Sequence, residues 1–368
     1  MKIKLYTHEE MLLTLLRSSL TQTPANASVF DNVTPENWRK CYKLSESQGV
    51  KALAWDGLMT LPSEIRPSKQ LFLNWALAVE KYEHNYEHYC KTIAKLSDFY
   101  SEHGISTMQM KGVAFSLYYP HPEHREGGDI DIYTYSSDTS SMSDEEANSL
   151  ADKLMEQQGI LVSYEGYKHS VFHYNGVEIE NHKCFLNVKT IKSSVPVENE
   201  LRKVLKPERV SLLDGKYSIL VPSDAFNTLF ISFHAMQHIG AGVNLHHVCD
   251  WACLLNKSGM LIPPELTDTS FHRGLSMFNK FVSRFFGTEV PTECSEDDLD
   301  KFFWLIMREP DEQKTNSHNP FKIIYVKIRH FYRFVTLRKI MLGEPIMPRL
   351  FKGIYELFFR PRVIFSKK

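Results

Sequence analysis

The sequence predicts an α/β (α+β) protein in which a mixed sheet is flanked by helical regions at both ends of the chain. Three observations predict this class: helical periodicity over residues 1–103, strand-like runs with hairpin signals over 104–222, and helical periodicity again over 223–368. A chain of 368 residues exceeds the size at which a single hydrophobic core usually stops growing. We therefore predict three parts, with the sheet in the middle one.

The first region, residues 1–103, has apolar residues at helical spacing. A helix is expected over 7–20, further helices over about 35–57, and a long helix from Pro67 to Glu102. Proline suits the first turn of a helix, because the N–H group that it lacks would be unpaired there in any case. The whole region is therefore expected to be helical.

The middle region, residues 104–222, mixes strands with helices. A strand is expected over Ile105–Met110, a short helix over 113–119, and a second strand that begins at Asp129. A helix is expected over 144–158, because a serine and a glutamate three residues apart form a capping box at its start.

Two turn signals predict hairpins in the same region. Asn175-Gly176 and Asp214-Gly215 each separate two apolar runs. Such pairs favour the positive φ angles that tight hairpins require. Two hairpins among helix-linked strands predict a sheet that is not purely parallel.

The third region begins after Pro222, where helical periodicity returns. One helix is expected over 224–238, capped by Ser223 or Asp224, and another over about 245–256. Aromatic-rich helices are expected to follow.

The end of the chain is strongly basic. Residues 321–368 hold twelve Lys and Arg against two Glu, a net charge of +10, whereas the whole chain has a net charge of −1. Phe and Tyr are interleaved with these basic residues. Such a segment could bind nucleic acid by stacking and charge, or lie on an anionic membrane surface. We favour a third interpretation, an amphipathic segment that packs its aromatic residues on the core.

The composition excludes several classes of protein. With 43% hydrophobic and 24% charged residues, the chain has ordinary globular composition. Its six cysteines are scattered and no apolar leader follows Met1, so we expect a reduced, cytoplasmic protein without a transmembrane segment. P-loop, Rossmann and serine-hydrolase classes are excluded, because the chain lacks their glycine-rich and nucleophile motifs.

The most informative pattern is the pair Asp129 and Asp131, which lies two residues apart in a strand-like run. Alternate residues of a strand point to one face, so both carboxylates project together. Hard oxygen ligands in this arrangement suit Mg²⁺ or Mn²⁺, which also bind substrate phosphates. We expect the two carboxylates to be exposed and to repel one another. Neutralising either should then leave the fold intact or slightly more stable.

Residues upstream of the pair suit a triphosphate. Lys111 supplies a cation and Gly112 an approachable backbone. Arg125 follows, and Gly128 lets the chain enter the strand at an angle that a side chain would hinder. An Asp-x-Asp pair alone is usually a solvated surface feature, but this ordered combination is far more specific.

A third acidic residue is expected on the strand that follows Asn175-Gly176. Glu178, Glu180 and His182 share one face of this strand. One interpretation is the solvent face of an edge strand, and the other is a further metal ligand. The turn places Glu178 nearer the hairpin tip and Glu180 deeper in the sheet.

The order Lys111-Gly112, Arg125 and Gly128–Asp131 resembles a family of largely uncharacterised bacterial nucleotidyltransferases within the DNA polymerase β-like superfamily. The resemblance implies a nucleotidyltransferase core with a glycine turn, an Asp-x-Asp strand and a third carboxylate on a later strand. There the Glu-x-His element of the family matches Glu180–His182. The usual Gly-Ser turn of the superfamily is Lys111-Gly112-Val113 here, which leaves Lys111 and Arg125 as the expected phosphate contacts.

The resemblance therefore implies a metal-dependent enzyme. Asp129, Asp131 and Glu180 would hold Mg²⁺ or Mn²⁺, and His182 would support them or move a proton. An NTP such as ATP would be the donor. An unknown acceptor, a small molecule or a protein side chain, would receive the nucleoside monophosphate with release of pyrophosphate.

Two alternatives stay open. One is a non-catalytic nucleotide- or partner-binding protein on the same fold. The other is an RNA-modifying transferase that uses the basic segment 321–368. Four histidines, His234, His238, His246 and His247, form a further cluster in the third region. They are interpreted mainly as structural residues, or else as polar groups of a substrate pocket.

Overall fold

The computed structural model describes most of the chain: residues 3–164, 166–189, 194–259, 262 and 269–308, with positions 325, 328 and 351. The basic segment 321–368 lies outside the described residues apart from those three positions. The side chains of 237–242 also lie outside them, and these include His238.

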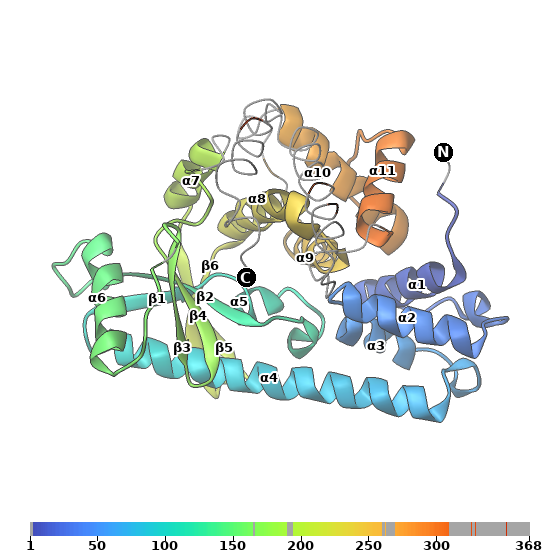
Figure 1. Cartoon of the computed structure of the whole chain (residues 1–368), viewed down its shortest axis with the longest axis horizontal. Coiled ribbons are helices and arrows are strands. Elements are labelled where there is room, and N and C mark those ends of the chain that lie inside the picture. The colour runs from blue at the N-terminus through green and yellow to red at the C-terminus, as the bar shows by residue number, and fades with distance from the viewer. Residues whose placement is uncertain are drawn as a thin grey trace.

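The described strands form one six-stranded sheet in the order β3-β4-β2-β1-β6-β5 (Figure 1). Strand β1 pairs parallel with β6 and β2 pairs parallel with β4, while the other neighbours are antiparallel. The predicted mixed sheet is therefore confirmed. The strands are β1 Ile105–Gln109, β2 Asp129–Ser136, β3 His169–Tyr174, β4 Val177–His182, β5 Pro207–Leu212 and β6 Tyr217–Pro222.

Helices precede, interrupt and follow the sheet, as the periodicity predicts. Before it come α1 Thr7–Thr21, α2 Pro35–Ser47, α3 Lys51–Met59 and α4 Lys69–Ser101. Between its strands lie α5 Val113–Ser116, α6 Asp144–Gln157 and α7 Ser194–Lys203. After it come α8 Asp224–Gly242, α9 Leu245–Ser258, α10 Thr269–Phe281 with a π-helical turn Val282–Phe286, and α11 Glu296–Met307.

The two faces of the sheet have different partners. Ile130 and Ile132 of β2 are fully buried in a cluster with apolar residues of α4 and α6, such as Ile93 and Ala147. Figure 1 shows α4 running along this side, while α8 and α9 lie on the other. Because side chains alternate along a strand, the aspartates of β2 point away from the α4 side.

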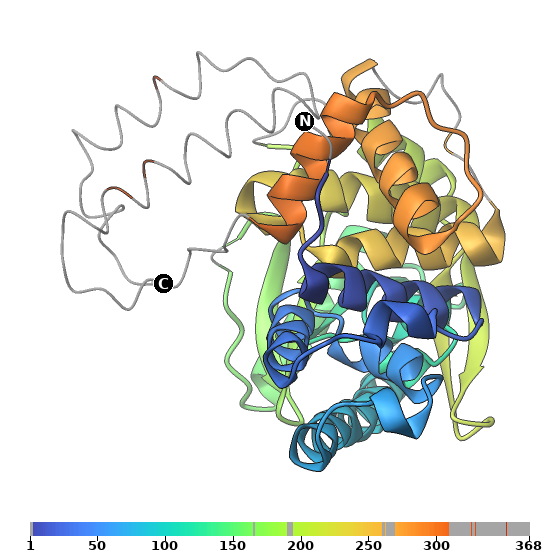
Figure 2. The same ribbon diagram turned by 90° about the vertical axis from the view of Figure 1, so that its right-hand side faces the viewer.

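A second hydrophobic cluster joins the two ends of the chain. It packs α1 and α3 against the helices that follow the sheet, with Leu12, Leu53, Phe281 and Phe302 among its buried residues. Figure 2 shows the C-terminal helices stacked on the N-terminal ones. The boundaries 1–103, 104–222 and 223–368 stay a prediction, since this cluster crosses between the first and third parts.

Several predicted local signals occur in the structure. Ser143 and Glu146 form the capping box of α6, and Ser223 caps α8. Asn175 and Gly176 both have positive φ, 54° and 79°, in a two-residue hairpin turn. Pro67 is the exception: the long helix begins at Lys69 with Ser68 as its N-cap, so the proline precedes the helix.

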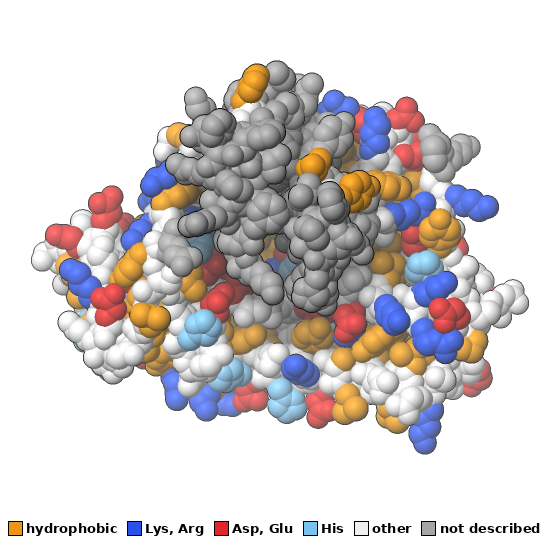
Figure 3. Space-filling view, in the orientation of Figure 1, with side chains coloured by type: hydrophobic (Ala, Val, Ile, Leu, Met, Phe, Trp, Pro, Cys, Tyr) orange, Lys and Arg blue, Asp and Glu red, His pale blue; other side chains and the backbone are white. Residues whose placement is uncertain are grey.

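Helix α7 was not predicted. It is short and polar, with Val197 and Leu201 buried one turn apart, and this pattern is too weak to stand out in the sequence. None of the described helices combines the length and apolar character that a membrane crossing requires. On the face shown in Figure 3, acidic and basic side chains are interspersed across the coloured surface, in keeping with the small net charge.

Candidate active site

A polar cavity of about 320 Å³ lies between one end of the sheet and helices α8 and α9. Six of the eight predicted site residues line it, whereas Gly128 and His182 do not. Its lining comprises Lys111, Gly112, Arg125, Glu126, Gly127, Asp129, Asp131, Lys168, His169, Glu180, Ile231, His234, His246, His247 and Asp250.

Strand register brings the acidic residues together. In the parallel pair of β2 and β4, Asp131 lies opposite Glu180 and Asp129 lies opposite Glu178. Residues opposite one another on neighbouring strands point to the same face. Glu180 lines the cavity, but Glu178 lies nearer the hairpin tip, with its carboxylate 3.8 Å from His173.

Asp131, Glu180 and His182 form a compact group whose ligand atoms lie within 4.8 Å of one another. The His182 Nε2 atom is 2.9 Å from Asp131 Oδ1 and 3.2 Å from Glu180 Oε2. Burial and the neighbouring Asp131 charge oppose the ionisation of Glu180, but the hydrogen bond and charge of His182, together with the charge of His169, outweigh them and lower the pKa of Glu180. Two carboxylates with an imidazole form a donor set that fits a divalent cation. Asp129 is outside this compact group.

Asp131 is buried and paired, which corrects the expectation of two exposed, repelling carboxylates. It is 1% exposed, and its Oδ1 accepts from both Lys111 Nζ and His182 Nε2 at 2.9 Å. Burial alone would raise the pKa of Asp131, but the charge and hydrogen bonds of these two partners hold it well below its usual range. The alternation of side chains along β2 correctly predicted that both aspartates point to one face of the sheet. It did not predict that Lys111, at the end of β1, covers Asp131.

Asp129 is in a different state from Asp131. It is only partly buried, and burial raises its pKa, which the neighbouring Asp131 carboxylate raises further against the effect of Lys111. The two aspartates thus differ: the site stabilises the anion of Asp131 and disfavours the anion of Asp129.

The turn after β1 requires glycine. Gly112 has φ +55° and ψ −124°, and a Cβ atom there would lie 3.1 Å from the Gln109 side chain and 3.4 Å from the Asp129 carbonyl oxygen. The turn therefore brings the backbone against the start of β2 and places Lys111 over Asp131.

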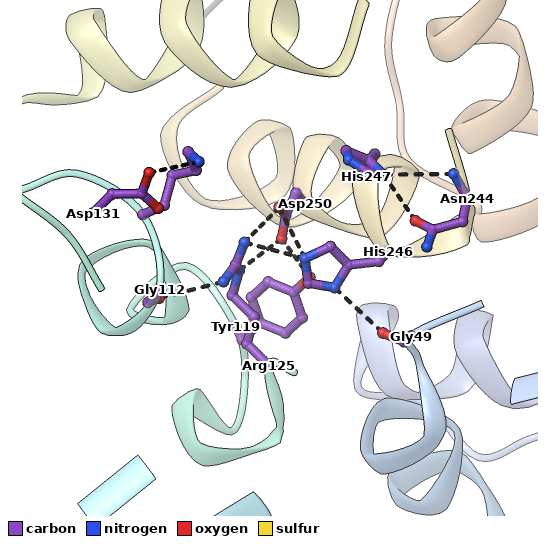
Figure 4. Close-up of polar contacts among 10 residues, drawn as sticks. Gly49, Gly112, Tyr119, Arg125, Asp131, Asn244, His246, His247 and Asp250 are labelled. Carbon is purple, nitrogen blue, oxygen red and sulfur yellow. Dashed lines mark hydrogen bonds and ion pairs between the residues drawn. The ribbon is translucent and has the colours of Figure 1, made fainter. Parts of the chain in front are cut away.

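Arg125 is held by a buried carboxylate that the sequence did not indicate as its partner. Its Nε and Nη2 atoms donate to the two oxygens of Asp250 on α9, at 2.9 and 2.8 Å (Figure 4). The Tyr119 hydroxyl donates to the same carboxylate at 2.6 Å. Burial of Asp250 would raise its pKa, but Arg125, with smaller contributions from His246 and Tyr119, outweighs burial and lowers the pKa to about 2. The Arg125 charge is therefore already balanced, and its predicted role as a phosphate contact stays a prediction.

The residues on either side of Arg125 are also anchored. His124 lies between two carboxylates, with Nδ1 2.7 Å from Asp56 and Nε2 3.1 Å from Glu83. The Glu126 carboxylate accepts from the backbone N–H groups of Lys51 and Ala52, at the start of α3. Three consecutive residues before the Asp-x-Asp strand are thus fixed to three different helices, α3, α4 and α9.

The histidines of α8 and α9 are not part of the metal-compatible group found among the described side chains. His246 has Nδ1 3.3 Å from the Gly49 carbonyl oxygen and Nε2 3.2 Å from Arg125, while His247 contacts Asn244 (Figure 4). His234 lines the cavity from α8. His246 and His247 thus make contacts within the protein and also line the cavity, so the structural and the substrate-pocket interpretations both stay predictions.

Sequence reasoning missed Lys168 and His169, which precede and begin β3. His169 Nε2 is 3.4 Å from Glu180 Oε2, and Lys168 lines the cavity beside it. The hairpin could have indicated them, because its register places His169 opposite His182.

A polar cavity with a carboxylate–imidazole group at the end of a mixed sheet defines a candidate metal-binding site. A family model described as uncharacterised nucleotidyltransferase matches residues 34–267, well over half of the chain. The protein therefore belongs to this family of nucleotidyltransferases, as the motifs around Asp129 predict. No curated protein and no solved structure gives a significant match.

Proposed function

We propose that the protein is a metal-dependent nucleotidyltransferase that moves a nucleoside monophosphate from an NTP to a hydroxyl acceptor and releases pyrophosphate. The observation that carries the proposal is the pairing of Asp131 with Glu180 across β2 and β4, with His182 against both, at the cavity wall. Family membership supports the reaction class. ATP is the first donor to test, with Mg²⁺ or Mn²⁺.

Asp129, Asp131 and Glu180 would hold the metal, because their oxygen atoms suit these hard cations. The bound metal would supply charge stabilisation at the phosphorus that is attacked. His182 would orient the Asp131 and Glu180 carboxylates. Its own ring is oriented by the Cys184 carbonyl oxygen, 3.3 Å from Nδ1.

The phosphate side of the site would be the turn after β1. Lys111 would bind the triphosphate after exchanging Asp131 for a phosphate oxygen. Arg125 contacts the Gly112 carbonyl oxygen at 3.5 Å, and so supports the turn as well as facing the cavity. A Cβ atom at Gly128 would meet no neighbour within 4 Å, so backbone near the acidic strand is open to a ligand.

The acceptor side would be the wall formed by α8 and α9, where Ile231 and His234 face the cavity. A small hydroxylated molecule or a protein side chain would be the acceptor. We place the reaction in the cytoplasm, in keeping with the six free thiols. RNA as an acceptor would depend on segment 321–368, which lies outside the described residues.

The test begins with a thermal-shift screen of the four NTPs, each with and without Mg²⁺. A nucleotide-selective, metal-dependent shift identifies the donor, and pyrophosphate release with candidate acceptors then tests turnover. Binding without any pyrophosphate release would favour the non-catalytic alternative. Absence of any metal-dependent nucleotide binding would reject the proposal. Salt-sensitive RNA binding by the full chain would instead support the RNA-modifying alternative.

A further inference from the structure

The cavity is lined by two lysines and an arginine among the described residues, and two of these three cations are already neutralised. Lys111 is 2.9 Å from Asp131, and Arg125 is 2.8 Å from Asp250. Lys168, in contrast, forms no ion pair within the described part of the chain. It is therefore the cation that can bind an anion without giving up a carboxylate.

Lys168 is held at a fixed place beside the acidic group. Its carbonyl oxygen accepts from the backbone N–H groups of Lys183 and Cys184, at 2.7 and 3.3 Å. These bonds fix the start of β3 against the end of β4. Lys111 follows β1 and Lys168 precedes β3, so the two lysines approach Asp131 and Glu180 from opposite edges of the acidic strands.

The surroundings of Lys168 disfavour a positive charge in the absence of a ligand. Burial lowers its pKa to about 8, and the nearby Lys111 ammonium acts in the same direction. A partly buried ammonium without a partner costs stability, and a bound anion would remove that cost. Two ammonium groups close enough to influence one another suit a ligand with several negative charges.

We propose that Lys168 binds phosphate oxygens of the polyphosphate chain of the donor nucleotide. The inference rests on the proposed function for the identity of the nucleotide, but the polyphosphate contact can be tested separately. Charge-assisted hydrogen bonds to phosphate are among the stronger polar contacts in proteins. Lys168 would thereby fix the position of the leaving pyrophosphate relative to Asp131.

The test uses inorganic tripolyphosphate as the probe, in titration calorimetry on the full chain without divalent metal. Lys168→Met keeps most of the length of the side chain and removes its charge, and should weaken binding about tenfold or more. Lys168→Arg should recover most of the affinity. Lys183→Met is the matched control, because Lys183 is nearby but exposed and outside the cavity lining, and it should bind like the wild type.

The apo Lys168→Met variant should unfold at the same temperature as the wild type or a higher one, because it loses an unpaired charge. Wild-type protein that binds no tripolyphosphate, or Lys168→Met that binds it like the wild type, overturns the inference. If Lys168→Met loses tripolyphosphate binding while the wild type releases no pyrophosphate from any NTP, only the proposed reaction fails. If the wild type turns over and Lys168→Met keeps its KM for the NTP, only the Lys168 assignment fails.

Discussion

Neutralising the two aspartates of β2 should have opposite effects on the stability of the metal-free protein. Asp131→Asn removes a buried anion that accepts from Lys111 and His182, and leaves the Lys111 ammonium without its partner. Asp129→Asn removes a carboxylate whose ionisation the site disfavours. Sequence alternation alone would treat the two positions as equivalent, so the contrast tests the site geometry directly.

The magnitude follows from the burial of the pair. Removing one partner of a buried ion pair typically costs about 3–5 kcal/mol. A change of 1 kcal/mol corresponds to about 2–4 °C in a domain of 150–250 residues, and to less in a longer chain. With the lower factor of about 2 °C, Asp131→Asn should lower the melting temperature by at most roughly 6–10 °C. Asp129→Asn should leave it unchanged or raise it slightly.

The pH dependence has the same contrast. The folded-state pKa of Asp131 is depressed, so its stabilisation is present above the unfolded value of about 3.9 and is lost as pH falls below it. The folded-state pKa of Asp129 is raised, so the free energy of unfolding should fall as pH rises from the unfolded pKa of Asp129 through its higher folded-state pKa.

The assay is urea denaturation and thermal unfolding in EDTA, with Lys111→Met and the Lys111→Met/Asp131→Asn double variant as controls. If the two side chains form a stabilising pair, the double variant should be less destabilised than the sum of the two single changes. The reasoning is refuted if Asp131→Asn stays within about 1 kcal/mol of the wild type, or if Asp129→Asn is the more destabilised variant.

Three further predictions concern catalysis, pH and metal. Pyrophosphate release should collapse in Glu180→Gln and survive in Glu178→Gln, because only the first lines the cavity; the reverse order would mean that β4 uses another register in the active protein. The pKa of His124 is raised to about 9, because its carboxylate partners outweigh the effect of burial. The protonated ring should therefore contribute about 3 kcal/mol to the free energy of unfolding below about pH 6.5, and this contribution should be lost as pH rises through 9. Unfolding measured from pH 6 to 10 should show this loss in the wild type and not in His124→Gln, and equal slopes would contradict it. Lys111→Met should bind Mn²⁺ more tightly than the wild type in a direct titration, because no ammonium then competes for Asp131; weaker binding would show that Lys111 assists the metal.

Periodicity and turn signals predicted most of the fold because they depend on near neighbours in sequence. The Asn175-Gly176 turn fixes the register of β4, and the alternation of β2 places both aspartates on one face. The two-residue spacing of Glu178 and Glu180 then permits only one of them to lie beside Asp131. These features follow from local geometry, and each is found in the structure.

The electrostatic state of the site could not be predicted in this way. Asp131 is paired with Lys111, which follows the neighbouring strand β1, and Arg125 is neutralised by Asp250, which is 125 residues away in sequence. Lys168 carries no motif, and only the pairing of β3 with β4 places it near the acidic residues. Contacts between segments that are distant in sequence decide which charged side chains are paired. A local sequence pattern does not reveal those contacts.

The anchoring of three consecutive residues before β2 has a consequence for the order of folding. Glu126 needs α3, which is synthesised earlier, but Arg125 needs Asp250 on α9, which emerges from the ribosome more than a hundred residues later. Until α9 docks, Arg125 lacks the carboxylate with which it pairs, and the loop that leads into Asp129 lacks its attachment to α9. We therefore expect the sheet to form during synthesis while the candidate site at its end is still unassembled, and the site to be complete only after the helices that follow the sheet have packed.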